Sequence, residues 1–225
     1  MAEPSPGTQT LSMPLEEAMR TQRAIRRLKP DPVDDALVLH LIELALRAPS
    51  GSNAQNWHFV VVKDRAVKAR LGNLNRQAWR LYGGIGRRMA HNDPPMLRIL
   101  EAVQWQADHF EEIPVIVVAC LATMIPLMPR IAVSSLYGSI YPSVQNLLLA
   151  ARAAGLGACL ITLPLWSTFL ARRALGLPWT VTPCAVIPIG WPRGTAGSPS
   201  GRRAPPRRPG DASSDRSGHG ASRAG

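Results

Sequence analysis

Apolar residues recur along the chain at two periods, and each period predicts a different kind of element. Within residues 34–47 large apolar side chains return every three or four positions, which is typical of an amphipathic helix. His58–Lys63 and Val115–Cys120 are short runs dominated by β-branched residues, and these favour buried strands. Thr182–Ile189 is a third such run. The pattern therefore predicts a mixture of helices and short buried strands.

Further elements follow from the same reading of periods and of helix-breaking residues. A helix is expected to begin near Pro14 and run toward Arg27, where Leu28–Pro32 cannot remain helical. Gly157–Thr162 is compatible with a strand or a loop. The remaining helices are expected at 64–80, 96–110, Ser139–Ala154 and 167–175. Helices outnumber strands and alternate with them irregularly, so we expect an α+β sandwich with a central sheet of four or five strands.

Composition divides the chain into one domain and two tails. With 225 residues and 46% hydrophobic residues, the chain can bury one sizeable core. Residues 1–13 are mostly Pro, Ser, Gly and Thr, and residues 193–225 are rich in Pro, Gly, Ser and Arg. Such segments bury too little apolar surface to offset their conformational entropy. We therefore expect a disordered N-terminus at 1–13, a domain at 14–192 and a disordered basic tail at 193–225.

Nearly half of the formal net charge of +11 lies in this tail. Seven Arg and two Asp lie in residues 193–225, a net charge of +5. A basic tail can bind polyanions non-specifically, which leaves a nucleic-acid-associated protein as one interpretation. A solvated tail without a partner is the other.

Several protein classes are disfavoured by simple features. The three cysteines, Cys120, Cys159 and Cys184, are too few for a disulfide framework and lack the spacing of metal ligands. Each stands in an apolar run, which favours buried, reduced thiols in a cytoplasmic protein. The N-terminus has no signal-peptide pattern, and apolar runs are interrupted well before about 18 residues. We therefore expect neither a bound metal nor a membrane span.

The first candidate motif is the pair Arg23 and Arg26. If the first helix continued to Arg27, these side chains would share one helical face, and two guanidinium groups could then clamp a dianionic phosphate. A solvated basic helix face is the alternative.

The second candidate motif is the loop Ala48–Trp57, with sequence Ala-Pro-Ser-Gly-Ser-Asn-Ala-Gln-Asn-Trp. Its small residues allow backbone to approach a flat ligand closely, and Ser50, Asn53 and Gln55 offer donors and acceptors for a polar ring edge. An ordinary polar loop between helix and strand is the alternative.

The third candidate motif is the helix at 139–154 followed by Gly155-Leu156-Gly157. Its apolar residues suit a plain core helix. Gln145 and Asn146 are harder to explain in that way, because buried amides need hydrogen-bond partners.

Taken together, in this order and spacing, the three motifs resemble the FMN-dependent nitroreductase-like family, which includes the iodotyrosine deiodinases. The resemblance covers about residues 15–192, and the Ile189–Pro192 turn fits it as well. It implies a three-layer sandwich in which helices flank a mostly antiparallel sheet. It also implies an interlocked homodimer with two FMN sites at the subunit interface.

The resemblance also assigns site residues. The flavin phosphate maps to Arg23 and Arg26, with Ala24 where the family usually has Ser. The flavin ring maps to Pro49, Ser50 and Asn53, with Gln145 nearby and with the backbone of Ile161, Thr162 and Leu163 beside the reactive nitrogen. A C-terminal arginine completes the phosphate site in the family. Its best matches here are Arg202 and Arg203, or Arg207, although the apolar residues of the usual family tail are missing from 193–225.

The activity implied is that of an FMN oxidoreductase. NADH or NADPH would donate a hydride to flavin N5, and a nitroaromatic, a quinone or a similar small acceptor would then receive it in a ping-pong cycle. No catalytic side chain is required. Nucleic acid and membranes are not expected as partners. The alternatives are a flavin-free, basic-tailed nucleic-acid-associated protein and a degenerate family member that serves as a binding module.

Overall fold

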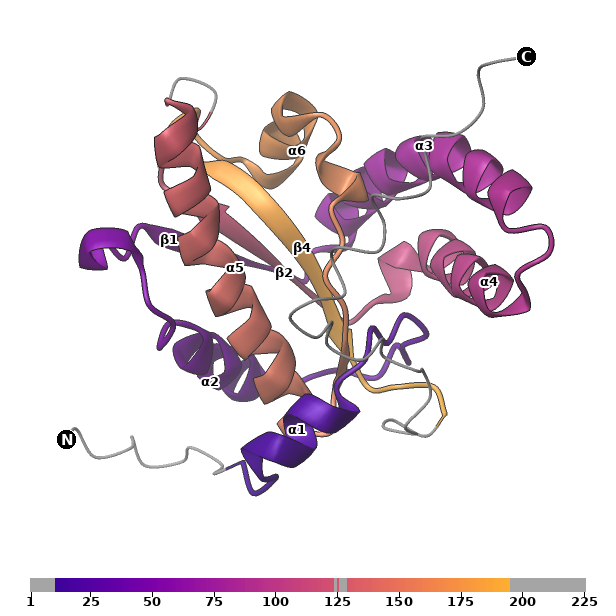
Figure 1. Cartoon of the computed structure of the whole chain (residues 1–225), viewed down its shortest axis with the longest axis horizontal. Helices are drawn as coiled ribbons and strands as arrows, with labels where there is room; N and C mark the ends of the chain where they lie inside the picture. The colour runs from indigo at the N-terminus through magenta and orange to yellow at the C-terminus, as the bar shows by residue number, and fades with distance from the viewer. Residues whose placement is uncertain (1–10, 124, 126–128, 195–225) are drawn as a thin grey trace, which may run out of the picture.

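Helices pack on both faces of a central sheet (Figure 1). The computed structural model describes residues 11–123, 125 and 129–194. The helices are α1 (Leu15–Thr21), α2 (Asp35–Ala45), α3 (Arg65–Met89), α4 (Pro94–Asp108), α5 (Arg130–Ala153) and α6 (Thr168–Leu175). The strands are β1 (Trp57–Val62), β2 (Val115–Leu121), β3 (Gly157–Ala158) and β4 (Thr182–Gly190). Short 3-10 turns are η1 (Gly51–Asn53), η2 (Phe110–Glu112) and η4 (Leu163–Leu165).

Within the described residues the strands form one four-stranded sheet of order β1-β2-β4-β3, and each neighbouring pair is antiparallel. Val118 at its centre pairs with Val60 on one side and with Val186 on the other. This confirms the expected α+β class, the antiparallel character and the number of strands.

Alternation along β2 explains why the sheet needs a helical layer on each face. Val115, Val117, Ala119 and Leu121 belong to the core formed with α2 and α5, whereas Ile116, Val118 and Cys120 belong to the opposite core. All seven residues of β2 are buried. A strand buried on both faces reads as a continuous apolar run, and this is the pattern that made β2 recognisable in the sequence.

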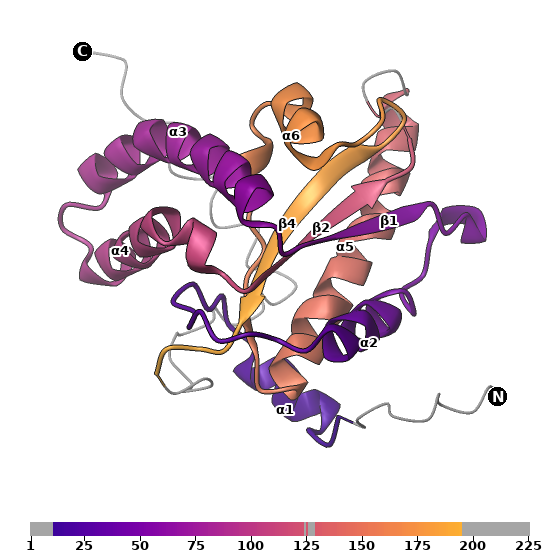
Figure 2. The same cartoon turned by 180° about the vertical axis from the view of Figure 1, so that it is seen from behind.

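The second core lies under α3 and α6, and α3 forms a hairpin with α4 that extends away from the sheet (Figure 2). Local capping fixes the ends of these helices. Asp64 accepts a hydrogen bond from Val67 N at 2.8 Å, and Asp93 accepts one from Met96 N at 3.0 Å. Asp and Ser are good N-cap residues, and Ser167 caps α6 in the same way at 3.4 Å.

Three helix boundaries differ clearly from the sequence prediction, and the first of these is the end of the helix expected at 64–80, which continues to Met89. The first helix ends at Thr21 and does not continue toward Arg27. α5 begins at Arg130, upstream of the expected start, and passes through Pro142. Ser139, where this helix was expected to begin, and Ser143 both lie inside α5 and donate to carbonyls, to Ser135 O at 2.9 Å and to Ala45 O at 2.8 Å. A hydroxyl can satisfy a helical or neighbouring carbonyl in this way, so a serine does not by itself mark a helix start.

The ends of the domain are only partly described. Leu11, which precedes the expected domain start at residue 14, packs against the α2–α5 core. Residues 195–225, which include Arg202, Arg203 and Arg207, lie outside the described residues. Among the described helices, none combines the length and the apolarity that crossing a bilayer requires. The described chain also contains no group of three or more His, Cys, Asp or Glu side chains placed to hold a metal ion.

The three cysteines are buried free thiols. Burial raises the pKa of Cys120 to about 12 and that of Cys184 to about 11. Although they lie on neighbouring strands, Cys120 belongs to the core under α3 and α6 and Cys184 to the core under α5. The two thiols therefore face opposite sides of the sheet and cannot form a disulfide.

Candidate functional site

The first candidate motif lies in an extended segment attached to the edge of the sheet. Ala24 forms a parallel bridge with Ala158, and Ile25 N donates to Ala158 O at 3.1 Å. Farther along, Leu28 bridges to Pro192. In extended backbone, residues three apart point to opposite sides. The expectation that Arg23 and Arg26 share one helical face is therefore wrong, because the helix ends before both of them.

The two arginines have different surroundings as a result. The Arg23 guanidinium donates to Arg20 O at 2.9 Å and to Gln22 O at 2.7 Å, and thereby covers carbonyls at the end of α1. Arg26 has a buried Nε without a hydrogen-bond partner among the described residues. A buried donor on a charged group is costly when unpaired, and such an atom in a native fold indicates a missing anionic or carbonyl partner. Arg26 is therefore the stronger candidate for a phosphate ligand.

Cys159 and Gln106 lie beside Arg26. Gln106 Nε2 lies 3.2 Å from Cys159 Sγ, and its side chain is 2% exposed. Burial raises the pKa of Cys159, and the hydrogen bond from Gln106 and the charge of Arg26 offset this only in part. Cys159 thus remains a protonated thiol, which supports the site structurally and does not act as a nucleophile. The sequence contains no signal for this contact, because Gln106 is one polar residue in an amphipathic helix.

Arg193, which follows β4, is a further cation beside this segment. No motif in the sequence assigned it to the site. Its backbone N donates to Arg27 O at 2.9 Å and its Nε donates to Leu28 O at 3.2 Å. Its guanidinium also lies 5.3 Å from the ring centre of Trp105 on α4. The arginines that the resemblance assigns to the phosphate site, Arg202, Arg203 or Arg207, lie outside the described residues.

The second candidate motif is a strained loop. Ser52, Asn53 and Gln55 have φ angles of 52°, 52° and 47°, in the left-handed region that residues other than glycine seldom adopt. Each such residue costs on the order of 1 kcal/mol, and clusters of them occur at ligand-binding sites where the surroundings enforce them. Within the loop, Gln55 N donates to Ser50 Oγ at 3.1 Å and Gln55 Nε2 donates to Asn53 Oδ1 at 2.8 Å.

α5 holds this loop in place. Ser139 Oγ accepts from Gly51 N at 3.0 Å, and Trp57 Nε1 donates to Ser139 O at 3.2 Å. Gly51 is required by this close approach, because a Cβ there would lie 2.7 Å from Ser135 Oγ. Pro49 and Asn53 are exposed and Ser50 is half-buried, so all three can reach a ligand.

Gln145 is not the buried amide that the sequence suggested. Its side chain is exposed on α5, so the argument from a buried amide needing partners is wrong for this residue. Asn146 is half-buried and lines an apolar hollow of about 250 Å³ between α1 and α5.

The third predicted group, Ile161, Thr162 and Leu163, continues the sheet edge that holds the first motif. Ile161 exchanges two backbone hydrogen bonds of 2.9 Å with Val186, and η4 begins at Leu163. Thr162 is exposed. The structure thus brings residues 161–163 and residues 23–26 to the same sheet edge. Residues 23–26 reach it through the bridge between Ala24 and Ala158.

The strained loop and the arginine segment lie near different ends of α5. Ser139 contacts the loop, whereas Arg152 donates through Nε to Thr21 Oγ1 at 2.9 Å, two residues before Arg23. At 1.5 Å per residue these two points are about 20 Å apart along the helix. Figure 1 shows the same separation, with α1 beneath one end of α5 and the η1 loop at the outer side of β1. A single chain therefore does not gather the two motifs around one small ligand.

The fold is the nitroreductase fold. The structure aligns with iodotyrosine deiodinase bound to FMN and 3-iodo-L-tyrosine with a TM-score of 0.65 at 20% identity, covering 88% of this chain and 98% of that chain. It also aligns with the FMN-dependent nitroreductase of Mycobacterium smegmatis in complex with NADPH, with a TM-score of 0.58 at 21% identity, covering 80% of this chain and 88% of that one.

The sequence agrees with the fold, since residues 19–191 match the Nitroreductase family. The chain belongs to this family. A relative from Methanothermobacter thermautotrophicus, which carries the provisional name NADH dehydrogenase/NAD(P)H nitroreductase, is 27% identical over 188 residues, or 83% of this chain and 81% of the relative.

Proposed function

We propose that the chain is an FMN-dependent NAD(P)H oxidoreductase that reduces small oxidised substrates such as nitroaromatics or quinones. The observation that carries the proposal is the buried, unpartnered Nε of Arg26 at the sheet edge that also holds residues 161–163. A phosphate would supply the missing partner, and a hydrogen bond to a charged group contributes about 1.5–3 kcal/mol. When bound, FMN would supply the redox chemistry by accepting a hydride from NAD(P)H and passing it to the acceptor.

The residues of the chain bind and orient the cofactor in this proposal. Arg26 would hold the phosphate, and Arg23 would support the end of α1 beside it. The exposed backbone near Thr162 would face the ring edge, while Pro49, Ser50 and Asn53 would contact the ring. Arg202 and Arg203 are proposed to complete the phosphate site from the tail, and Gln145 is proposed to lie near the ring on α5.

A homodimer follows from the separation of the two motifs along α5. We propose that the strained loop of one chain approaches the arginine segment of the other, so that each of two flavin sites uses both chains. Light scattering should then give about twice the chain mass of 24.4 kDa. The buried reduced thiols favour a cytoplasmic protein.

The test is the identity and reactivity of the bound flavin. Heat denaturation of the purified protein should release a compound that co-migrates with FMN. Anaerobic NADH or NADPH should bleach the flavin absorbance, and a quinone or nitroaromatic should restore it in a separate step, as a ping-pong cycle requires. Release of FAD, or failure to bind flavin after reconstitution, would contradict the proposal.

A tail deletion tests the contribution of Arg202 and Arg203. If they complete the phosphate site, deleting residues 195–225 should weaken FMN binding as much as replacing both arginines by Ala. Unchanged affinity in both variants would remove the tail from the site.

A further inference from the structure

A groove with one basic side and one aromatic side lies between α3 and α6. Its larger hollow, of about 340 Å³, is lined by Arg70, Asn73 and Gln77 of α3 and by Arg173 of α6. An adjoining hollow of about 240 Å³ lies between Arg173 and the aromatic pair Phe169 and Trp179. Arg173 lines both hollows, so they lie side by side. The larger hollow is within the size range of small-molecule sites, about 300–1,000 Å³.

The basic side carries no compensating charge. α3 contains seven Lys or Arg residues and no Asp or Glu. The sequence has no acidic residue from position 113 to position 210. Arg70 and Arg173 are exposed, and neither forms an ion pair within the described part of the chain. Uncompensated arginines in a concave surface concentrate anions.

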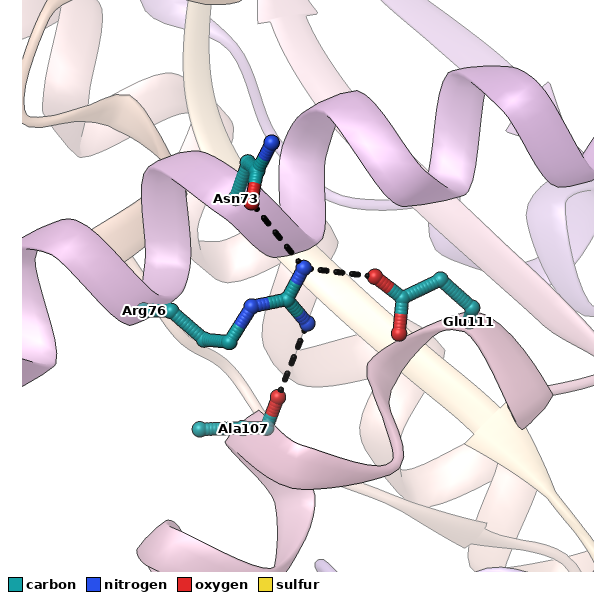
Figure 3. Close-up of polar contacts among 4 residues, drawn as sticks. All are labelled: Asn73, Arg76, Ala107 and Glu111. Carbon is teal, nitrogen blue, oxygen red and sulfur yellow. Dashed lines mark hydrogen bonds and ion pairs between the residues drawn. The ribbon is translucent and has the colours of Figure 1, made fainter.

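Arg76, which shares α3 with the basic side, is paired with the carboxylate of Glu111. Arg76 donates to Glu111 at 2.8 Å, to Asn73 Oδ1 at 3.1 Å and to Ala107 O at 3.3 Å (Figure 3). The Asn73 oxygen therefore binds Arg76, while its amide nitrogen points away from Arg76 in Figure 3. The groove thus offers guanidinium and amide donors.

The aromatic side is held in place without being buried. Trp179 and Phe169 stack with ring centres 5.7 Å apart, although they are 60% and 48% exposed. Buried Arg172 lies 5.5 Å from the Trp179 ring centre and is itself fixed by a 2.7 Å bond to Val181 O and a 2.8 Å bond to Thr182 Oγ1. A pair of ordered, exposed aromatic rings is a preformed surface for another planar ring.

We propose that this groove binds a nucleotide, with its base against Trp179 and Phe169 and its phosphate at Arg173 and Arg70. This goes beyond the proposed oxidoreductase function, since none of these residues belongs to the candidate flavin site. A nucleotide combines a planar ring with an anion. This matches a groove in which Arg173 lies between aromatic side chains and amide side chains. A free mononucleotide and the adenosine-phosphate half of a nicotinamide dinucleotide share this chemistry.

The test is a calorimetric titration of the full-length, FMN-saturated protein with AMP, adenosine and inorganic phosphate. AMP should bind more tightly than either fragment. Arg70→Ala/Arg173→Ala should weaken AMP binding by about tenfold or more, since two charged donors are lost. Trp179→Ala should weaken it by about fivefold or more, and Trp179→Phe should restore most of the loss. Arg88→Ala, at the far end of α3, is the matched control and should leave the affinity unchanged.

Competition distinguishes the two nucleotide sources. Mutual displacement of AMP and NADPH, lost in Arg70→Ala/Arg173→Ala, would identify the adenosine end of the dinucleotide, and independent binding would identify a free nucleotide. AMP binding that is lost in Arg26→Ala but kept in the groove variants would overturn the proposal. The proposal would also be overturned if phosphate bound as tightly as AMP and its affinity were unchanged in Trp179→Ala. FMN affinity should be unchanged in the groove variants, so failure of the flavin proposal and failure of the groove proposal are separable.

Discussion

The arginine segment at 23–28 and the strained loop at 50–55 differ in how the protein fixes them. The segment is paired through its backbone with β3 and with residues that follow β4, and one buried charged donor, Arg26 Nε, has no partner among the described residues. In the loop, Gly51 N and Gln55 N have hydrogen-bond partners, and three residues hold a positive φ. The arginine segment therefore holds a buried donor that lacks a described partner, on backbone that is fixed by pairing. The loop holds strained backbone dihedrals.

The difference explains what each region can contribute to a ligand site. An unpaired guanidinium on a fixed strand edge favours an anion strongly and in one position. A strained loop presents small polar side chains in a shape that a relaxed loop would not keep. We therefore expect the side chains proposed to contact FMN, Arg26 on the segment and Ser50 and Asn53 on the loop, to act mainly on FMN affinity. The groups that hold the two regions in shape should act mainly on stability.

The largest effect is expected from Arg26→Ala. Loss of a charged hydrogen bond of about 1.5–3 kcal/mol should weaken FMN binding by roughly tenfold to a hundredfold in a flavin-fluorescence titration. Arg23→Ala should have a smaller effect, since Arg23 is already bonded to carbonyls of α1. Arg27→Ala is the control, because Arg27 is exposed on the same segment. Equal losses at Arg26 and Arg27 would indicate a diffuse charge effect and not a phosphate contact.

Gly157→Ala should destabilise the support of the segment. An added Cβ would lie 2.7 Å from Ile25 Cγ2 and 2.9 Å from Leu28 Cδ2, and overpacking of this kind costs about 1–3 kcal/mol. Gly138→Ala is the matched control, since nothing lies within 4 Å of its Cβ, and alanine inside a helix should stabilise by about 0.5–1 kcal/mol. Urea unfolding measures both changes. An unchanged midpoint in Gly157→Ala would show that the segment is not packed tightly on β3.

Ser139→Ala should release the loop at its contact with α5. The hydroxyl accepts from Gly51 N at 3.0 Å, and its removal should lower the free energy of unfolding by about 1 kcal/mol. Ser134→Ala, an exposed residue on the same helix, should change stability little. Hydrogen exchange at Gly51 should accelerate in Ser139→Ala alone, and unaltered protection there would contradict the contact.

The smallest effect is expected from Ser52→Gly. Glycine adopts a φ of 52° without the steric cost that serine bears, so the variant should gain up to about 1 kcal/mol in the free energy of unfolding. The greater freedom of glycine in the unfolded chain offsets part of this gain. A clear loss of stability would mean that the Ser52 side chain has a role that outweighs the strain.

Much of the fold was predictable because β2 and β4 are buried along their whole length, and because β1, although partly exposed, is a run of aromatic and β-branched residues. β1, β2 and β4 were found close to their true limits from β-branched runs alone. The start of α5 was expected at Ser139 but lies at Arg130, and packing on α2 and the sheet keeps the helix intact through Pro142. Tertiary packing overrides local propensity at such positions.

The sequence could nominate candidate residues for the site but not their geometry. The order of the motifs pointed to Arg26 and to the loop, yet helical spacing gave a wrong reason for pairing Arg23 with Arg26. The contact of Gln106 with Cys159 and the placement of Arg193 depend on elements far apart in the sequence. Whether Gln145, Arg202 and Arg203 contact a flavin stays a prediction.

In the proposed homodimer each flavin site combines the arginine segment of one chain with the strained loop of the other. Two variants test it directly: Arg26→Ala, and Ser50→Ala/Asn53→Ala in the loop. Each alone should bind FMN weakly. When the two are mixed, unfolded and refolded together, half of the dimers pair one variant with the other, and each of these holds one intact site. FMN titration of the mixture should therefore recover about a quarter of the wild-type high-affinity sites. A mixture with no more high-affinity sites than its two components would contradict the claim.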